Sequence, residues 1–319
     1  GNLLAGEEAP TAPQDNFYAN LAEFLDDSQL KSLASKLLAD FKDDSLARKS
    51  YIETYTKGLD LLGFKYQEVT RPFIGASGVT HPLLAEAATQ FQAQAFKELL
   101  PSDGPVRCQV VGAESKETIQ QANRVKDYMN YQITDVMEEY TPEMDQMLFF
   151  LPLAGSTFKK VYYDPAAQRC KATFIHAEDL VVPYNASDLY EAERISEVQR
   201  VTKNTVAKRI ASGFYRDVEL PEPFFNEDRA QKKYQELEGV TPQKYQDLYN
   251  FVEMHVDLDL PGYESDDGVK VPYIVTLDRD SMTIMSIYRN YKPDDQSRKR
   301  IPYFVHYKFL PGLGFYGFG

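Results

Sequence analysis

Four histidines are the first side chains to consider for chemistry, because imidazole serves both as a metal ligand and as a general base. None has a partner four residues away, as a helical zinc site requires; they are His81, His176, His255 and His306. His255 and His306 fall in extended segments of one region, where we expect that they can meet across a sheet. Zinc normally needs three or four converging ligands, so ordinary polar packing is the favoured interpretation.

Neighbouring carboxylates are the second candidate, because two-metal hydrolases use acidic side chains that converge from different elements. Five adjacent pairs, among others in the sequence, fall at predicted helix ends or turns, where helix capping and turn formation explain them: Asp26-Asp27, Asp43-Asp44, Glu138-Glu139, Asp266-Asp267 and Asp294-Asp295. The triplet Asp278-Arg279-Asp280 likewise indicates a tight turn. We predict no catalytic, cofactor-binding or metal-binding residue, and no enzyme. A metal-dependent hydrolase that uses these Asp and Glu residues is the alternative from another class of protein.

Motifs for nucleotide and acyl chemistry are missing from the sequence. It contains neither a GxxxxGK[ST] phosphate-binding loop nor a GxSxG nucleophile turn. Its two cysteines, Cys108 and Cys170, lack metal-ligand spacing and indicate a reducing compartment without a disulfide framework.

Basic side chains gather at Lys159-Lys160, Lys232-Lys233 and Arg298-Lys299-Arg300. The last group lies in a predicted loop between strands. If the loop faces a DNA channel, it can touch phosphates; if it faces outward, it can bind an acidic protein. A solvated loop with neither role is as good an interpretation as the other two together. Arg298, Lys299 and Arg300 are therefore the candidate site for contacts with DNA or a protein adaptor.

Composition narrows the class of protein. The chain has 319 residues, a net charge of −13, 22 tyrosines, 19 phenylalanines and no tryptophan. Such acidity argues against a sequence-specific DNA-binding protein, which usually carries a basic face, but not against a protein past which DNA slides. The sequence has no apolar run long enough to cross a membrane and no secretory signal at its start. Its apolar, glycine-rich end leads us to expect a piece of a longer chain.

Helices are predicted by apolar residues that recur every three or four positions. The first carries Leu30, Leu33, Leu37 and Phe41 behind an N-cap at Ser28, and a second, from Asp44-Ser45 to Leu61 or Leu62, completes a helical hairpin. Further predicted helices are 82–100, Lys116–Tyr140 (the longest), 141–152 and 202–212. The helical segment 227–250 is polar on all sides.

Strands are predicted at 106–112, at 158–162 and 171–175 as a hairpin around Asp164-Pro165, and at 193–201. Strict alternation from Phe251 predicts four more strands within 251–310, as a small β subdomain that is marginal alone. The fold class is α+β. The predicted parts are a tail (1–15), a domain of helices and small sheets (16–226), the polar helical segment (227–250), the β subdomain (251–312) and the start of another helix (313–319).

Several phrases of this sequence resemble the portal protein of tailed bacteriophages, the head-to-tail connector. A helix ends in the small-residue turn Ala154-Gly155-Ser156, and a basic strand, an Asp-containing turn, a second strand and Val182-Pro183 follow. The phrases THPLL…AFKELLPSDGPV and Pro311-Gly312…Phe315-Tyr316-Gly317 are also similar to portal sequences. The resemblance covers most of the chain and rests on diffuse phrases.

The resemblance implies a wing (16–226), a stem-like helix (227–250), a clip (251–312) and, at 313–319, the start of a second stem helix. It implies a homo-oligomeric ring, usually of twelve subunits, at one capsid vertex of the virion and assembled in the host cytoplasm. Such a ring nucleates capsid assembly with scaffolding proteins and docks terminase and the head-to-tail adaptor. It passes double-stranded DNA without reading its sequence, during packaging and ejection. No cofactor and no membrane are expected, and another phage head or tail-connector protein is the structural alternative.

Overall fold

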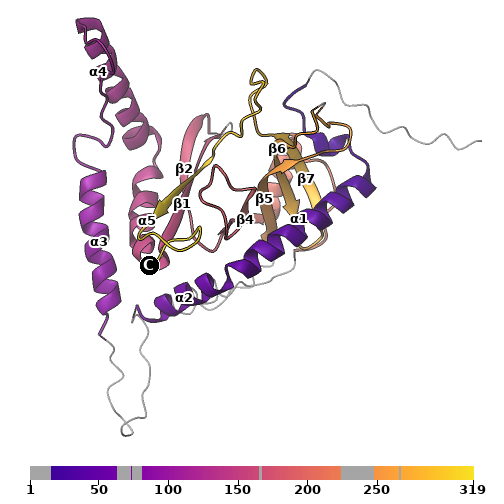
Figure 1. The fold of residues 1–319 in the computed structure, drawn as a ribbon, viewed down its shortest axis with the longest axis horizontal. Helices are drawn as coiled ribbons and strands as arrows, with labels where there is room; N and C mark the ends of the chain where they lie inside the picture. Colours follow the sequence, from indigo (N-terminus) through magenta and orange to yellow (C-terminus); the bar gives the residue numbers. More distant parts are fainter. Residues whose placement is uncertain (1–15, 63–72, 74–80, 165–166, 224–247, 266) are drawn as a thin grey trace, which may run out of the picture. The chain divides into compact units, whose positions relative to one another are not determined.

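The computed structural model describes residues 16–62, 73, 81–164, 167–223, 248–265 and 267–319. Within these ranges the helices are η1 (Leu21–Glu23), α1 (Asp27–Ala47), α2 (Lys49–Asp60), α3 (Leu83–Leu99), α4 (Lys116–Tyr131), the π-helical η2 (Gln132–Val136), α5 (Tyr140–Ala154) and α6 (Lys203–Ala211). The strands are β1 (Ser156–Asp164), β2 (Arg169–Ile175), β3 (Leu180–Val181), β4 (Arg194–Thr202), β5 (Leu248–Leu258), β6 (Val271–Asp278), β7 (Thr283–Arg289) and β8 (Phe304–Lys308). Helices and antiparallel sheets coexist in one chain, which confirms the α+β class (Figure 1).

The chain divides into two compact units. The first consists of Gly1–Ile52 and Glu178–Pro302, and the second consists of Glu53–Ala177 and Tyr303–Gly319. The first holds the five-stranded sheet in the order β3-β4-β5-β6-β7, and the second holds the sheet β2-β1-β8. This pairing corrects the prediction that 251–312 is a four-stranded subdomain of its own. Three of its strands complete a sheet with β3 and β4, and the fourth, β8, pairs with β1.

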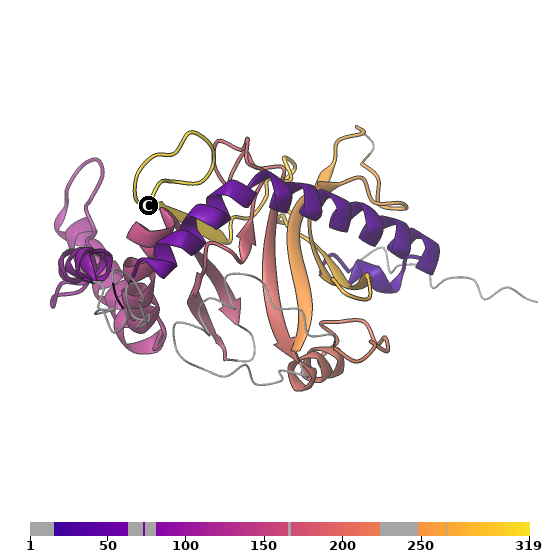
Figure 2. The ribbon, with the colours of Figure 1, turned by 90° about the horizontal axis from the view of Figure 1, so that it is seen from below.

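The core of the first unit lies between α1 and one face of its sheet (Figure 2). Period-two alternation places Val252, Met254 and Val256 of β5 on this face, and all are buried. Helical spacing brings Leu30 and Leu37 of α1 against them, with at most 2% of either side chain exposed. The predicted apolar face of this first helix is therefore confirmed.

The start of α1 differs from the prediction by two residues. Asp26, not Ser28, is the N-cap: its carboxylate accepts the Gln29 N–H at 2.8 Å, and the Gln29 side chain accepts the Asp26 N–H at 3.1 Å. Aspartate is as good a cap as serine, and the reciprocal bond from Gln29 decides between them. Only Arg48 separates α1 from α2, so the predicted helical hairpin is wrong, because a hairpin needs a loop of at least two residues.

The outer edge of β7 is covered by a side chain. The Asn20 amide donates to the Met285 carbonyl at 3.2 Å and accepts the Ile287 N–H at 3.0 Å, so it bonds the strand as a neighbouring strand would. The Arg216 N–H donates to the same Met285 carbonyl at 2.9 Å. Buried backbone groups need partners, and these bonds satisfy them where the sheet ends.

In the second unit, α5 packs on one face of the sheet β2-β1-β8 and contacts α3. Met144, Met147 and Leu148 of α5 form the centre of this packing, against Phe91 of α3 and Phe174 of β2. The predicted hairpin of β1 and β2 is confirmed, with Phe158 paired to Ile175 and Asp164 to Arg169; Pro165 of its turn lies outside the described residues.

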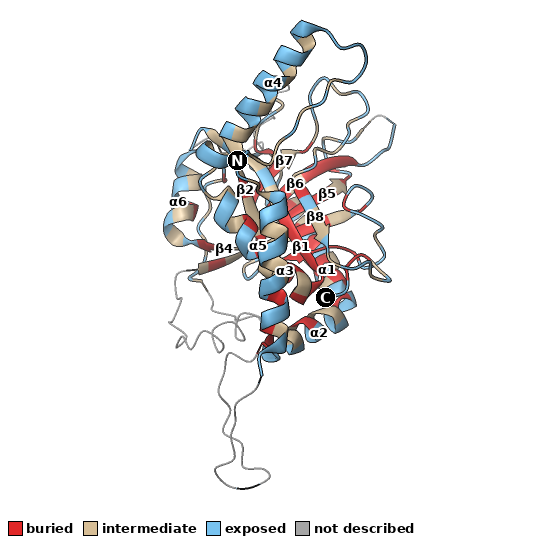
Figure 3. Ribbon diagram, turned by 90° about the vertical axis from the view of Figure 1, so that its left-hand side faces the viewer, coloured by how far each residue is buried: buried red, intermediate tan, exposed pale blue. Residues whose placement is uncertain are grey.

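Two predictions between residues 106 and 140 are wrong. Residues 106–112 form no strand; instead, the Asn130 side chain bonds both the N–H and the C=O of Val106, at 2.8 and 3.2 Å. The predicted helix Lys116–Tyr140 ends at Tyr131, and η2 and a short irregular link separate it from α5. No residue of α4 is buried, so its apolar residues have no core here to keep the helix regular into α5 (Figure 3).

Other predicted parts lie partly or wholly outside the described residues. The tail 1–15 and residues 227–247 of the stem-like segment are among them, while 248–250 belong to β5. Residues 313–319 are not helical; they form a loop closed by a bridge between Leu310 and Phe318, which corrects the prediction of a second stem helix there. None of the described helices has the length and apolarity needed to span a membrane.

Candidate functional site

The predicted basic site lies in the loop between β7 and β8. Backbone bonds from Asn290 N to Pro272 O (2.8 Å) and from Ile301 N to Asn290 O (3.0 Å) hold its base. Inside the loop, Asp295 accepts the hydroxyl of Ser297 at 2.6 Å and the N–H of Lys299 at 3.0 Å. These bonds to the charged form lower the pKa of Asp295 below its ordinary value, with the Ser297 hydroxyl as the largest cause.

Arg300 is turned toward the protein. Its guanidinium donates to the carbonyls of Ala192 and Glu193, at 2.7 and 3.3 Å, and to the Asp257 carboxylate at 2.9 Å. A planar guanidinium with several fixed donors suits this kind of clamp. Three of its bonds are therefore made within the first unit, to groups far away in the sequence.

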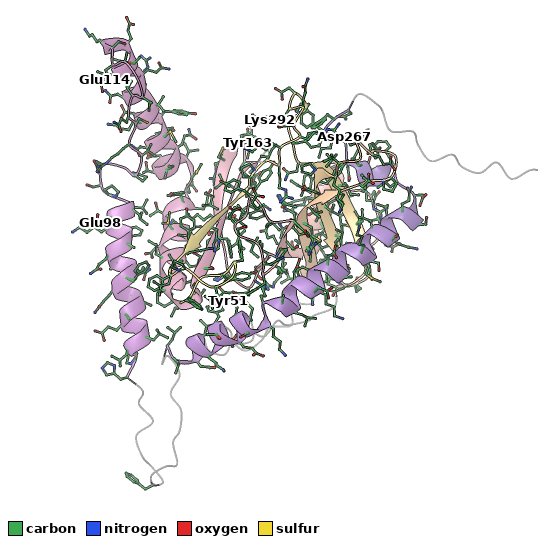
Figure 4. All side chains as sticks on the ribbon, viewed as in Figure 1. Tyr51, Glu98, Glu114, Tyr163, Asp267 and Lys292 are labelled. Atoms are coloured by element: carbon green, nitrogen blue, oxygen red, sulfur yellow. The ribbon has the colours of Figure 1, made fainter. Side chains whose placement is uncertain are left out.

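Arg298 and Lys299 have different surroundings. The backbone of Arg298 is left-handed (φ +49°), and its guanidinium bonds the Ser265 hydroxyl on the loop that carries Asp267. Figure 4 labels Asp267 and Lys292, which mark the two loops that this bond joins. Lys299 is exposed. The three residues thus form no common basic surface: two clamp loops of the first unit, and Lys299 alone points a charge at solvent.

The histidines do not form a shared site. His255 lies on β5 and His306 on β8, in different sheets, so the expectation that they meet across one sheet is wrong. His255 is buried and bonds the Glu253 carboxylate at 2.8 Å. His81 is exposed, and His176 packs against Phe150 and Phe174. Among the described residues, no group of three or more His, Cys, Asp or Glu side chains is arranged to hold a metal ion.

Ser156 and His306 resemble a nucleophile and its base, with 2.9 Å between Oγ and Nε2. Ser156 is fully buried, however, and its Oγ also accepts the Gly317 N–H at 2.8 Å. The imidazole stacks on Phe158 and Phe315, each with its ring centroid at 4.6 Å. Burial lowers the pKa of His306 to about 3, far from the value that suits a general base at neutral pH. The pair therefore holds the fold together.

The turn Ala154-Gly155-Ser156 and the segment Pro311-Gly312…Phe315-Tyr316-Gly317 meet in the structure, where the bonded residues Ser156 and Gly317 are 161 positions apart in the sequence. Gly155 ends α5 in the left-handed conformation (φ +71°). A Cβ on Gly155 would lie 2.4 Å from the Gly317 carbonyl, and a Cβ on Gly317 would lie 2.3 Å from the Gly155 carbonyl. The two backbones therefore touch at a point where only glycine fits. The two phrases form one structural unit at the C-terminal end of α5.

The sequence did not predict the environment of Lys159. It lies on β1 and is only 2% exposed, whereas the apolar Val161 of the same strand is 41% exposed. The Lys159 Nζ is 4.3 Å from the centre of the Tyr140 ring and has no hydrogen-bond partner. Period-two alternation does not account for this burial, because Val161 lies on the same face of β1 and is exposed, while Phe158 on the other face is buried too. The first residues of β1 are buried on both faces, and nothing in the spacing of the sequence indicates this.

Comparisons with known proteins leave the family open. No protein-family model matches this sequence, and no curated protein matches it at a significant level.

Proposed function

We propose that this chain is a subunit of a phage portal, a ring at one capsid vertex through which double-stranded DNA is packaged and ejected. The observation that carries the proposal is the meeting of the Ala154-Gly155-Ser156 turn with Pro311-Gly312…Phe315-Tyr316-Gly317. These are two of the phrases by which the sequence resembles portal proteins. Two phrases that resemble a family support the resemblance more strongly when they contact each other in the fold. A change in one phrase would then require a compensating change in the other.

The electrostatics support a passive relation to DNA. The chain has a net charge of −13, and of the three candidate contact residues, Arg298 and Arg300 already bond groups of the protein. Phosphate contacts dominate protein–DNA affinity, so an acidic chain whose two candidate arginines are engaged within the protein favours weak binding. We expect the purified protein to bind duplex DNA weakly and in a salt-sensitive way in a filter-binding assay. Tight binding that salt does not weaken would argue against the proposal.

Ring formation is the decisive test, because the proposed mechanism needs a closed ring of identical heterologous contacts. The purified protein, at increasing concentration, is examined by negative-stain electron microscopy and by light scattering. We expect rings with an axial hole wide enough for a DNA duplex. Sheets, filaments or tubes without such a hole would instead indicate another phage head or tail-connector protein, and a monomer at every concentration would overturn the proposal.

A further inference from the structure

Lys159 is an amine enclosed between β1 and the first turn of α5, both in the second unit. It is 2% exposed, and its Nζ has no hydrogen-bond partner. A protonated ammonium has three donors, and burying it without acceptors is costly. The contact with the Tyr140 ring, at 4.3 Å, offsets only part of that cost.

The nearest carboxylates are engaged elsewhere. Glu139 accepts the Arg169 guanidinium at 2.6 Å and the Ala172 N–H at 3.3 Å. Glu143 accepts the Phe174 N–H at 2.6 Å. Both acids act on Lys159 through space and favour its charge, but neither bonds it. They instead join the start of α5 to β2, at the edge of its sheet.

These bonds hold the start of α5 over Lys159 and against the edge of β2, and the start of α5 can move away when they break. The two N–H groups that the carboxylates accept belong to β2, an edge strand of the described sheet. The preceding turn η2 is π-helical and contains no buried residue, so it offers little resistance to movement. The second half of α5 is fixed by Met147 and Leu148, which are buried.

We propose that the first turn of α5 is a proton-controlled latch on β2: it opens more readily while Lys159 is charged, because opening hydrates the ammonium, and less readily once the amine is neutral. The other groups that act on Lys159 are Glu139 just before α5, Tyr140 and Glu143 of α5, and Arg169 of β2 through its bond to Glu139. Tyr307 of β8 interacts with Tyr140. Burial raises the pKa of Tyr140 and of Tyr307, so both phenols stay neutral up to pH 10. The Glu139 carboxylate, whose pKa is lowered by its bond to Arg169 against the effect of burial, stays ionised.

The pH range follows from the amine. Burial lowers the pKa of Lys159 from 10.5 to about 8 in the closed form, and hydration in the open form restores its ordinary value. The open form therefore binds more protons between these two values, so the opening equilibrium falls as pH rises from about 8 to about 10. Below that range both forms are charged, and opening no longer depends on pH through this group.

The test is hydrogen exchange at the Ala172 and Phe174 amides of the full chain, corrected for the intrinsic exchange rate at each pH. A Cys170→Ser background removes the exposed thiol on β2. From pH 7.5 to 9.5 we expect the opening equilibrium to fall on the order of tenfold. A flat profile would overturn the proposal, and this measurement needs no change at Lys159.

Two matched variants separate the charge from the packing. Lys159→Met keeps the length and apolar stem of the side chain, and we expect it to reduce opening on the order of a hundredfold at pH 7.5 and to abolish the pH dependence. Lys160→Met, on the next residue and the opposite face of β1, is the control, and we expect it to behave like the unchanged chain. If Lys159→Met opens more readily than the unchanged chain, Lys159 stabilises the closed form and the proposal is wrong. None of these results depends on whether the chain forms rings.

Discussion

At the residue scale, the sequence alone does not show whether a basic side chain is exposed to solvent or bonded within the protein. Arg300 stands in a loop rich in charged residues, yet it bonds the Ala192 carbonyl and Asp257 within the first unit. Lys159 is a charged residue of a strand, yet it is buried. The positions of both side chains depend on groups from distant segments, which accept hydrogen bonds from Arg300 and cover Lys159. The spacing of residues in the sequence does not reveal these groups. The predicted position of residues 298–300 in a loop between strands is confirmed, and their role as contacts for DNA or an adaptor stays a prediction.

Replacing Arg300 tests its role as a clamp. We expect Arg300→Ala to lower the free energy of unfolding by about 1–3 kcal/mol, because it leaves two carbonyls and the Asp257 carboxylate without their donor. Lys299→Ala is the matched control and should change stability by less than about 0.5 kcal/mol, since the residue is exposed. Urea titrations measure both. Equal effects would mean that Arg300 is a surface charge like its neighbour.

His306 predicts a pH dependence of stability. Its pKa is about 3 in the folded chain because it is buried, against 6.5 when exposed, so the unfolded chain binds the additional proton between these values. Stability therefore rises with pH across this range, and His306→Phe should reduce that slope by up to about 1 kcal/mol per pH unit. Unfolding curves between pH 4 and 6.5 measure it, with the exposed His81→Gln as control. An unchanged slope would contradict the burial of the imidazole.

At the element scale, local patterns predicted most helices and strands, and the failures have physical causes. Alternation located β5, β6 and β7, and the hairpin of β1 and β2 follows from its own turn. The predicted helix through Tyr140 failed because no core lies beneath α4, so the apolar repeat alone does not keep the helix regular beyond Tyr131. The predicted strand at 106–112 failed because its partner is the single side chain of Asn130.

The end of α5 offers a matched pair of glycines. Gly155 and Gly213 have almost the same backbone, with φ of +71° and +72°, but a Cβ on Gly155 meets backbone at 2.4 Å whereas nothing lies within 4 Å of one on Gly213. Gly213→Ala should cost about 1 kcal/mol, for the left-handed conformation alone. Gly155→Ala should cost at least about 2 kcal/mol more, because the C-terminal loop must move. Denaturant titrations measure the free energy of unfolding of both variants. Equal decreases would mean that the C-terminal loop does not lie against Gly155.

At the scale of the whole molecule, local patterns do not determine which strands share a sheet. The sequence predicted four strands after residue 250 as a self-contained group, since they follow one another closely. The pairing instead joins β5 to β4 and β8 to β1, through segments separated by many residues. Which strands pair depends on which apolar faces share one core. In the first unit α1, which comes early in the sequence, covers one face of β5, β6 and β7. The α+β class was predictable, but this grouping was not.

A fragment of residues 251–312 tests this topology. We expect it to be unfolded alone, because β5 loses its partner β4, β8 loses its partner β1, and the sheet loses α1. Its proton–nitrogen NMR spectrum should show amide shifts in the narrow range of a disordered chain. A dispersed spectrum from a monomeric fragment would mean that these strands pair differently.

The division of the first unit into two distant stretches also governs how the chain can fold while it is made. Its residues up to Ile52 leave the ribosome before Glu178–Pro302, which supply the described strands of their sheet. Synthesis proceeds at about 5–20 residues per second, so the apolar side of α1 stays uncovered on the nascent chain for seconds or longer. Until those strands are made, the apolar side of α1 lacks the sheet that covers it, and we expect the yield of folded protein to depend on the rate of translation.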